Sequence, residues 1–314
     1  MTAAPRVLSH VGDLPRFRET MRAEGLDVEV TPIPQDGPID PAAGGEVLLT
    51  PAQVAPNLDA VLARGVRWVH TVGTGIDTFS LGILDGRPLT VSRGATSVPI
   101  AEWVMAQILT AEKNLPQSWV TAPPERWGGA ELGSLDGATV AILGLGATGI
   151  ALAERALPFG AHVRALRRSG APSPVAGVQV VRDTAELVDG ADHVVLAAPL
   201  TADTAGIVDA GFLRRMKPGA HLINVARSGL VVDDDLKAAL DSGALGLASL
   251  DVAPTEPLPA GHWYYRHPRV RFSPHSSWSG RGVWESIVDS FTGNYRRYAA
   301  GRQLEDVVDV SLGY

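Results

Sequence analysis

The sequence contains no cysteine among its 314 residues, which excludes disulfide bonds, thiol catalysis and cysteine-ligated zinc. It also lacks an apolar run that approaches the roughly 20 residues of a membrane span. The N-terminal stretch has no long apolar core of the kind that secretion signals carry. Because nothing in the sequence indicates a membrane partner, we expect a soluble, cytoplasmic protein.

The chain also has few positively charged residues. It contains 27 Lys and Arg and 34 Asp and Glu, which gives a net charge of −7. An acidic chain is a poor partner for nucleic acid or for an anionic membrane. Hydrophobic residues make up 45% and charged residues 19% of the chain, a composition that can bury ordinary cores and has no signature of disorder. At about 150 residues per domain, the length predicts two domains.

Short apolar runs alternate with helical patterns along the chain, which is typical of βα units and parallel sheets. The first hundred residues contain five predicted strands: RVLSHV, VEVTPI, EVLLT, VRWVHTV and LTVSR. A second series begins at Ala138 with seven predicted strands: ATVAILGLG, AHVRALRR, VQVV, DHVVLAAPL, AHLINVA, LGLASLDV and VRFSP. We therefore expect an α/β protein with two doubly wound parallel sheets.

Two long helices are predicted at the ends of these series. The first follows Ser97, which we expect to cap it, and has Pro99 in its first turn. The second is indicated by apolar residues that recur every four positions over 283–295, and it should end near Gly301. The stretch 121–137 breaks the helical pattern and is expected to form a loop.

Three glycines point to a dinucleotide. Gly144, Gly146 and Gly149 have the G-x-G-x-x-G spacing, directly after an apolar strand and directly before a helical pattern. The first glycine permits a tight turn, the second lets backbone N–H groups approach a pyrophosphate, and the third allows close helix–strand packing. The helix N-terminus then favours the anion. The alternative is a structural turn that binds no ligand.

The residues about 20 positions further on should select the cofactor. A dinucleotide-binding chain usually has a carboxylate there, which accepts hydrogen bonds from the ribose hydroxyls. This chain has Arg167, followed by Arg168 and Ser169. A guanidinium cannot accept those bonds, but its planar donors match a phosphate. The sequence therefore predicts NADP(H) in preference to NAD(H), unless the two arginines are only solvated surface residues.

Four polar residues follow predicted strands of the second series: Arg227, Asp251, Glu256 and His275. In an open parallel sheet, ligands bind beyond the carboxyl ends of the strands. Arg227 can bind the carboxylate and ketone of a 2-oxo acid, His275 can donate a proton to the developing alkoxide, and Glu256 can orient the His275 ring. Taken singly, each of these residues also has a purely structural explanation.

Five motifs stand out in this part of the chain. Three of them contain the four polar residues: MKPGAHLINVARSGLV, LDVAPTEPLP and SPHSSW. The other two are GLGATG, which contains the three glycines, and APLTADT, which overlaps the end of a predicted strand. Through them the chain resembles the D-isomer-specific 2-hydroxyacid dehydrogenase family over almost its whole length. The resemblance implies that Arg227, Glu256 and His275 are catalytic, and that Asp251 binds the amide of the nicotinamide. We expect no metal ion.

The resemblance also implies the domain organisation. A Rossmann dinucleotide-binding domain, residues 99–282, would be inserted into a flavodoxin-like substrate domain formed by residues 1–98 and 283–314. Family members generally dimerise through the nucleotide domain, so a homodimer is expected.

Further site residues follow from the same resemblance. TVGTGID looks like the loop whose backbone N–H groups hold the substrate carboxylate. The expected substrate-binding residues are Thr74, Gly75, Ile76, Arg227, His275 and Trp278. The expected cofactor-binding residues are Gly144, Gly146, Ala147, Thr148, Gly149, Arg167, Arg168, Ser169, Pro199, Thr204, Ala226, Arg227, Asp251 and His275.

The sequence departs from the family pattern at Arg167, because acidic residues are common at this cofactor position in the family. The arginine places the chain nearer to an NADP-using branch. Two related activities stay open: phosphite dehydrogenase, which keeps the same catalytic trio, and a dinucleotide-sensing corepressor, which can also retain it. The formate branch has glutamine in place of Glu256, which counts against that activity.

The sequence does not separate candidate substrates, which are glyoxylate, hydroxypyruvate, phenylpyruvate and branched 2-oxo acids. Trp263, Tyr264 and Tyr265 either close a pocket over an aromatic or branched substrate, or pack at a subunit interface or on the next helix. His262 and His267 are expected at the surface.

Overall fold

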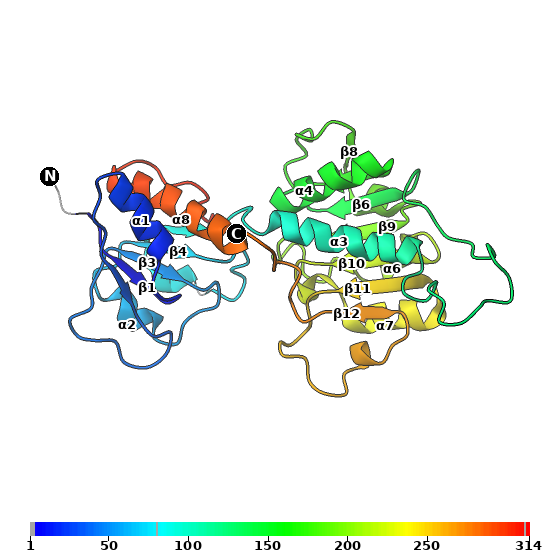
Figure 1. Ribbon diagram of the computed structural model, residues 1–314, viewed down its shortest axis with the longest axis horizontal. Helices are drawn as coiled ribbons and strands as arrows, with labels where there is room; N and C mark the ends of the chain where they lie inside the picture. The colour runs from blue at the N-terminus through cyan, green and yellow to red at the C-terminus, as the bar shows by residue number, and fades with distance from the viewer. Residues whose placement is uncertain (1–3, 80, 311) are drawn as a thin grey trace. The chain divides into compact units, whose positions relative to one another are not determined.

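The computed structural model of the chain describes residues 4–79, 81–310 and 312–314. They form two compact units, each built around its own parallel sheet (Figure 1). Unit 1 comprises the described residues of Met1–Ala95 and Arg281–Tyr314, and unit 2 comprises Thr96–Gly280. Because the chain leaves unit 1 and later returns to it, unit 2 is an insertion.

Unit 1 has a five-stranded sheet in the order β2-β1-β3-β4-β5, with every pair parallel. This is the strand order of flavodoxin-like folds. The elements of unit 1 are β1 (Val7–Ser9), α1 (Pro15–Ala23), β2 (Val30–Pro32), β3 (Val47–Thr50), α2 (Leu58–Leu62), β4 (Trp68–Thr71), the 3₁₀ helix η1 (Leu81–Leu84), β5 (Leu89–Val91) and α8 (Val283–Ala299).

The unit 1 sheet is buried on both faces, which explains why its strands are near-continuous apolar runs. Leu48 and Val69 lie in a cluster with residues of α2. The neighbouring strand residues Val47 and Trp68 lie in a second cluster with residues of α1 and α8. This alternation follows from the two-residue period of a β-strand.

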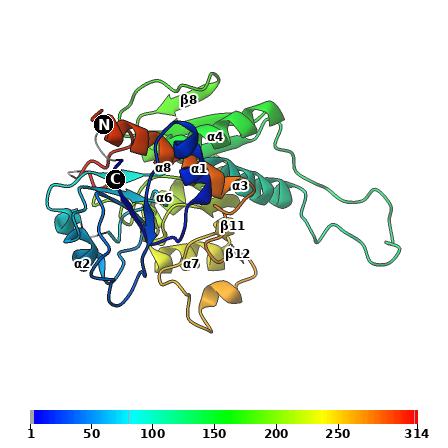
Figure 2. The ribbon, with the colours of Figure 1, turned by 60° about the vertical axis from the view of Figure 1, so that its left-hand side comes forward.

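The C-terminal segment belongs to unit 1. In Figure 2, α8 lies beside α1, and Phe17 of α1 contacts Phe291 of α8 with ring centroids 5.0 Å apart. Beyond α8 the tail runs along β5, where the N–H of Val308 donates to the carbonyl of Leu89 at 2.8 Å. The tail thus protects the outer edge of the sheet.

Unit 2 has a seven-stranded parallel sheet in the order β12-β11-β10-β9-β6-β7-β8. Counted from β6, this is the Rossmann order 3-2-1-4-5-6 with β12 added at one edge. The elements of unit 2 are α3 (Ser97–Glu112), β6 (Thr139–Leu143), α4 (Ala147–Ala156), η2 (Leu157–Phe159), β7 (His162–Leu166), β8 (Val178–Val181), α5 (Thr184–Val188), β9 (His193–Leu196), α6 (Ala210–Arg215), β10 (Ala220–Asn224), η3 (Ser228–Leu230), α7 (Asp233–Ser242), β11 (Leu245–Leu250), η4 (Trp263–Tyr265) and β12 (Val270–Phe272).

Helices cover both faces of this sheet as well. Residues of α3 and α4 form one apolar cluster with the strands, and residues of α5, α6 and α7 form another. The expected fold class, two doubly wound parallel-sheet domains with one inserted into the other, is therefore confirmed.

The start of α3 differs from the expectation. Ser97 is the first residue of the helix and is buried, and Thr96 is the N-cap residue, with no capping hydrogen bond from its side chain. The prediction that Ser97 caps α3 was wrong because the helix begins one residue earlier than expected, which places Ser97 inside the first turn.

Residues 113–134 leave the end of α3 and extend away from the rest of unit 2 in both Figure 1 and Figure 2. Two hydrogen bonds close the base of this segment: the N–H of Gly133 donates to the carbonyl of Glu112 at 2.9 Å, and Lys113 Nζ donates to the carbonyl of Gly133 at 2.7 Å. The expected loop over 121–137 is present.

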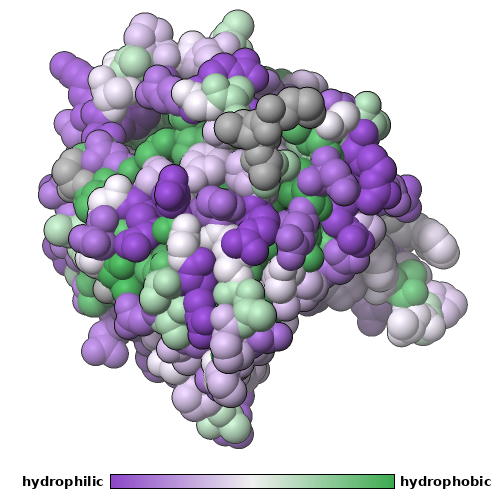
Figure 3. Space-filling view, turned by 90° about the vertical axis from the view of Figure 1, so that its left-hand side faces the viewer, coloured by the Kyte–Doolittle hydropathy of each residue, from purple (hydrophilic) through white to green (hydrophobic). Residues whose placement is uncertain are grey.

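Within the described part of the chain, no helix is both long and apolar enough to cross a membrane. In Figure 3, hydrophilic residues predominate on the face in view, and hydrophobic residues appear there in separate areas.

Candidate active site

The predicted site residues of unit 2 lie along one edge of its sheet. Gly144 directly follows β6, Arg167 follows β7, Arg227 comes after β10, Asp251 follows β11, and His275 lies just beyond β12. Because all the strands are parallel, their carboxyl ends meet at the same edge. The order reverses between β6 and β9, which is where open α/β sheets bind ligands.

The glycine turn has the geometry that a pyrophosphate requires. Gly144 has a φ of +105°, and a Cβ there would lie 2.6 Å from the backbone nitrogen of Ala198. A Cβ on Gly149 would lie 2.2 Å from the carbonyl oxygen of Gly144. A Cβ on Gly146 would meet no atom within 4 Å, so the space at the start of α4 is open. The residues present therefore fit a phosphate group at this helix N-terminus.

Arg167 and Arg168 lie in the turn after β7 and line a pocket of about 700 Å³. Arg182, which follows β8, lines the same pocket. Nη1 of Arg167 donates to the carbonyl oxygen of Pro172 at 3.0 Å, which fixes one side of the guanidinium. Ser169 is exposed in the same turn. Arg182 forms an ion pair with Glu186, with Nε 3.3 Å from Oε2. The guanidinium groups of Arg167 and Arg168 at one pocket favour an anionic ligand.

His275 and Glu256 are in hydrogen-bond contact at this edge. Nδ1 of His275 lies 2.7 Å from Oε2 of Glu256, and both side chains are partly exposed. The other carboxylate oxygen of Glu256 accepts a hydrogen bond from the N–H of Ala253 at 3.1 Å. The contact through Nδ1 fixes the plane of the ring and leaves Nε2 for a reacting group.

The loop that carries His275 is bound to Asp251. Asp251 is fully buried, and its Oδ1 accepts from the hydroxyl of Ser273 at 2.5 Å and from the N–H of Ser276 at 2.9 Å. Its Oδ2 accepts from the N–H of Ser277 at 2.8 Å. Apart from the serines that surround His275, no sequence signal indicated this role.

Arg227 lies in a turn that is held by the last residue of β10. Asn224 is buried, accepts from the N–H of Ala226 at 3.0 Å and donates to the carbonyl of Arg227 at 2.9 Å. The Arg227 side chain is half-buried, and its Nη1 donates to the carbonyl of Ala226 at 2.8 Å. Asn224 was missed in the sequence, although a polar residue at the end of an apolar strand is a signal that could have revealed it.

The remaining predicted cofactor residues of unit 2 lie in the same region. Ala147 and Thr148 begin α4. Pro199 and Thr204 lie in the turn after β9, where the hydroxyl of Thr204 donates to the carbonyl of Pro199 at 2.7 Å. These residues stay predictions as cofactor ligands.

The predicted substrate loop belongs to unit 1. Thr74, Gly75 and Ile76 follow β4, and the side chain of Ile76 is buried in the core of that unit. A contribution of Ile76 to binding would therefore come from its backbone, in agreement with the expected role of N–H groups in this loop.

The aromatic residues of the loop before β12 divide into two groups. Trp263 Nε1 and the Tyr264 hydroxyl both donate to Asp233, the first residue of α7, at 2.9 and 2.6 Å. Burial and the bond to Asp233 raise the pKa of Tyr264. Of the alternatives considered, packing on a neighbouring helix therefore describes these two residues. Tyr265 is exposed and donates to the carbonyl of Leu258 at 3.0 Å.

Trp278 lies close to the catalytic candidates. Its Nε1 donates to the carbonyl of His275 at 2.8 Å, and 46% of the residue is exposed. His262 and His267, expected at the surface, are half-buried. Among the described residues, no group of three or more histidines and carboxylates could hold a metal ion.

Comparisons with known proteins identify the family of the chain. A model of the NAD-binding domain of D-isomer-specific 2-hydroxyacid dehydrogenases matches residues 105–277. Glyoxylate/hydroxypyruvate reductase A of Serratia proteamaculans (strain 568) is 34% identical over 272 residues, a match that covers 82% of this chain and 85% of the relative.

Two solved structures are similar over nearly the whole chain. The first is a D-isomer-specific 2-hydroxyacid dehydrogenase of Xanthobacter autotrophicus Py2, in complex with NADPH and MES. Its TM-score is 0.86 and its identity 26%, and the match covers 100% of this chain and 100% of the other. An NADPH-dependent glyoxylate/hydroxypyruvate reductase of Sinorhizobium meliloti, in complex with NADP and sulfate, has a TM-score of 0.80 and 26% identity, with 98% of this chain and 99% of the other covered.

Proposed function

Because the chain belongs to the D-isomer-specific 2-hydroxyacid dehydrogenase family, we propose that it reduces a 2-oxo acid to a D-2-hydroxy acid with NADPH. The observation that carries this proposal is the 2.7 Å contact between His275 and Glu256. It lies at the sheet edge that also bears the glycine turn, so the proposed proton donor and the proposed nucleotide site would share one edge of the sheet.

The cofactor would be held by the carboxyl edge of unit 2. Backbone N–H groups at Gly146, Ala147 and Thr148 would bind the pyrophosphate, and Arg167 and Arg168 would bind the phosphate on the adenosine ribose. When bound, NADPH supplies the hydride that the 2-oxo carbon accepts. The complexes of the two solved relatives with NADPH and NADP support this choice of cofactor.

His275 would hold the proton that the carbonyl oxygen receives. Because Nδ1 faces Glu256, the proton to be transferred would be carried on Nε2. The carboxylate of Glu256 would keep the ring oriented and would stabilise its charged form. Glu256 is thus a positioning residue in this proposal, and His275 is the catalytic acid.

Arg227 would bind the substrate carboxylate and the carbonyl oxygen through its planar fork of donors. Backbone N–H groups at Thr74, Gly75 and Ile76 would provide the second contact with the carboxylate. Trp278 would line the substrate pocket, since its ring lies next to the loop of His275. We assign Asp251 a positioning role in addition to the expected contact with the nicotinamide amide, because its oxygens already accept three bonds from the His275 loop.

The substrates would be small 2-oxo acids such as glyoxylate and hydroxypyruvate. Support comes from the names of the Serratia and Sinorhizobium relatives. Trp263 and Tyr264 both donate to Asp233, so these two rings pack within unit 2 and do not support a pocket for an aromatic or branched substrate.

We further propose that two copies of the chain associate through unit 2. The support is a group of large apolar side chains that are exposed on the segment 113–134, namely Trp119, Val120, Trp127 and Leu132. Surface residues of this size are enriched at interfaces between subunits.

The test is a panel of glyoxylate, hydroxypyruvate, phenylpyruvate and 4-methyl-2-oxopentanoate, with NADPH oxidation followed by absorbance. We expect turnover of the two smallest acids, and a kcat lowered about 10²–10⁴-fold in His275→Gln. Glu256→Gln should lower kcat less and change its pH profile. His162→Gln, at an exposed position of β7, is the matched control. Failure of all four acids, or full activity of His275→Gln, would overturn the proposal.

A further inference from the structure

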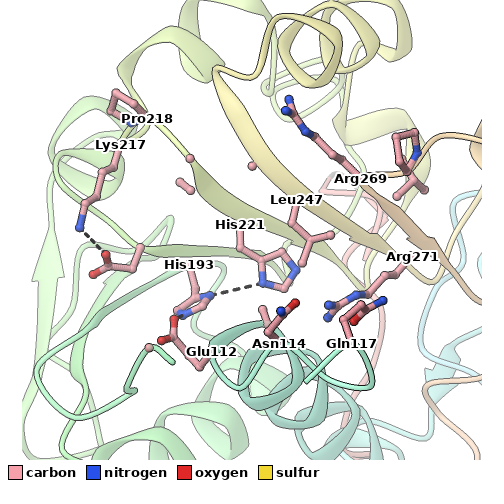
Figure 4. Close-up of a pocket in the computed structure, with 18 residues that line it drawn as sticks. Glu112, Asn114, Gln117, His193, Lys217, Pro218, His221, Leu247, Arg269 and Arg271 are labelled. Carbon is pink, nitrogen blue, oxygen red and sulfur yellow. Dashed lines mark hydrogen bonds and ion pairs between the residues drawn. The ribbon is translucent and has the colours of Figure 1, made fainter. Parts of the chain in front are cut away.

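A second pocket of about 700 Å³ lies on unit 2, away from the carboxyl edge (Figure 4). Its lining includes His193, His221 and Arg271, which lie at or near the start of β9, β10 and β12. The end of α3 and the residues after it complete the lining. Because the strands are parallel, this pocket lies at the edge opposite to that of Gly144 and His275.

Two basic side chains of this pocket contact carboxylates. Lys217 Nζ lies 2.5 Å from Oδ1 of Asp192, so this ion pair adds no net charge to the lining. Nε2 of His193 lies 3.0 Å from Oε1 of Glu112, but burial lowers the pKa of His193, so this second pair contributes the negative charge of Glu112. The guanidinium groups of Arg269 and Arg271 outnumber this one carboxylate.

The two arginines of β12 and the turn before it are different. No carboxylate of the described residues lies within ion-pair distance of Arg269 or Arg271. Arg269 Nη1 donates to the carbonyl of Leu240 at 2.7 Å, whereas Nη1 of Arg271 is buried and has no hydrogen-bond partner among the described residues. Arg271 therefore lacks a counter-group, which is unfavourable because a buried charged donor without an acceptor has lost its hydrogen bonds to water.

The neighbours of Arg271 are neutral and polar. His221 is buried, burial lowers its pKa, and its Nε2 lies 2.9 Å from the hydroxyl of Ser249. Asn114 and Gln117, labelled in Figure 4, line the same pocket as Arg271 and bring uncharged amide groups to it. The pocket thus combines an uncompensated guanidinium with uncharged hydrogen-bonding groups, on a chain whose net charge is −7.

We propose that this pocket binds a small oxyanion through Arg271, either inorganic phosphate or the carboxylate of an organic acid. Both ligands match the planar donors of a guanidinium and would supply the acceptor that Arg271 lacks. Asn114 and Gln117 would donate to further oxygens of the ligand. The site is separate from the phosphate site proposed at Arg167, since the two lie at opposite edges of the sheet.

The test is isothermal titration calorimetry of the full chain with inorganic phosphate in one arm and malonate in the other. Arg271→Gln should weaken binding about ten- to a hundredfold, the effect of losing a hydrogen bond to a charged group. Arg271→Lys, which keeps the charge but not the fork, should give an intermediate affinity. Arg266→Gln, at an exposed position outside the lining, should bind like the wild type.

Arg167→Gln separates this site from the proposed cofactor site and should retain the binding that depends on Arg271. Tighter binding of phosphate or of malonate identifies the ligand, and circular dichroism verifies that each variant is folded. The proposal is overturned if neither anion binds, or if Arg167→Gln abolishes binding while Arg271→Gln leaves it intact.

Discussion

Ser277 and Asp251 join the ends of two neighbouring strands, because the N–H of Ser277 donates to Oδ2 of Asp251 at 2.8 Å. Oδ1 of Asp251 accepts from Ser273 and from Ser276, so His275 lies between residues that are all attached to one carboxylate. His275 itself has a φ of +52°, a conformation that side-chain-bearing residues rarely adopt. Hydrogen bonds to Asp251 therefore hold His275 in an otherwise unfavourable backbone conformation.

Replacing Asp251 by Asn should weaken both the fold and the proposed catalysis. An amide offers only one acceptor oxygen, so at least one donor of the His275 loop loses its partner. We expect the free energy of unfolding to fall by about 1.5–3 kcal/mol and kcat to fall with it. Urea unfolding and steady-state rates measure the two effects. Asp203→Asn, on the exposed turn after β9, is the control, and identical behaviour of the two variants would contradict this role.

Arg167→Asp should exchange the cofactor preference. Loss of the guanidinium removes a charged hydrogen bond to the ribose phosphate, and the new carboxylate can accept bonds from the ribose hydroxyls of NADH. We expect kcat/KM for NADPH to fall about ten- to a hundredfold, with a rise for NADH. Arg214→Asp, at an exposed position on α6, should change neither value. A wild-type enzyme that already prefers NADH would refute the assignment.

The fold was predictable because its signals are local. Apolar runs at regular spacing indicate buried parallel strands, and both sheets follow from them. The three glycines are local signals too: Gly144 needs a positive φ, and Gly149 packs against the turn before it. Once the strands are parallel, residues that follow them meet at one edge, so the grouping of the site on unit 2 also followed from the sequence.

The supports of the site were not predictable, because they join residues far apart in the chain. Ser277 is 26 positions from Asp251, and Trp263 is 30 positions from Asp233. Nothing in the residues around Asp233 indicates that it binds two aromatic side chains. The prediction that Ser97 caps α3 was wrong for a different reason, since a shift of one residue at a helix end changes which residue caps it.

The proposed dimer can be tested through the segment 113–134, where Trp119 is 70% and Trp127 82% exposed. Large aromatic residues at the centre of an interface often contribute 2 kcal/mol or more each, so their loss weakens association about thirtyfold or more per residue. The double variant Trp119→Ser/Trp127→Ser should therefore be monomeric by light scattering. Trp284→Ser, 45% exposed on α8 of unit 1, should remain dimeric. A monomeric wild type would contradict the proposal.

His70 gives unit 1 a dependence of its stability on pH. Burial lowers the pKa of His70 to about 3, and its ring nitrogens lie 2.7 and 3.0 Å from the hydroxyls of Thr90 and Ser92. In the unfolded chain the same ring titrates near 6.5, so between about pH 6.5 and 3 only the unfolded state binds the proton. The contribution of neutral His70 to the free energy of unfolding is therefore fully present above about pH 6.5 and falls by about 1.4 kcal/mol for each pH unit below it.

The variant His70→Gln lacks this pH-dependent contribution, and buried histidines elsewhere affect both proteins equally. The difference in unfolding free energy between wild type and His70→Gln should change by about 2.3 kcal/mol from pH 6.5 to 4.5 in urea titrations, whereas parallel curves would show that His70 is protonated in the folded unit.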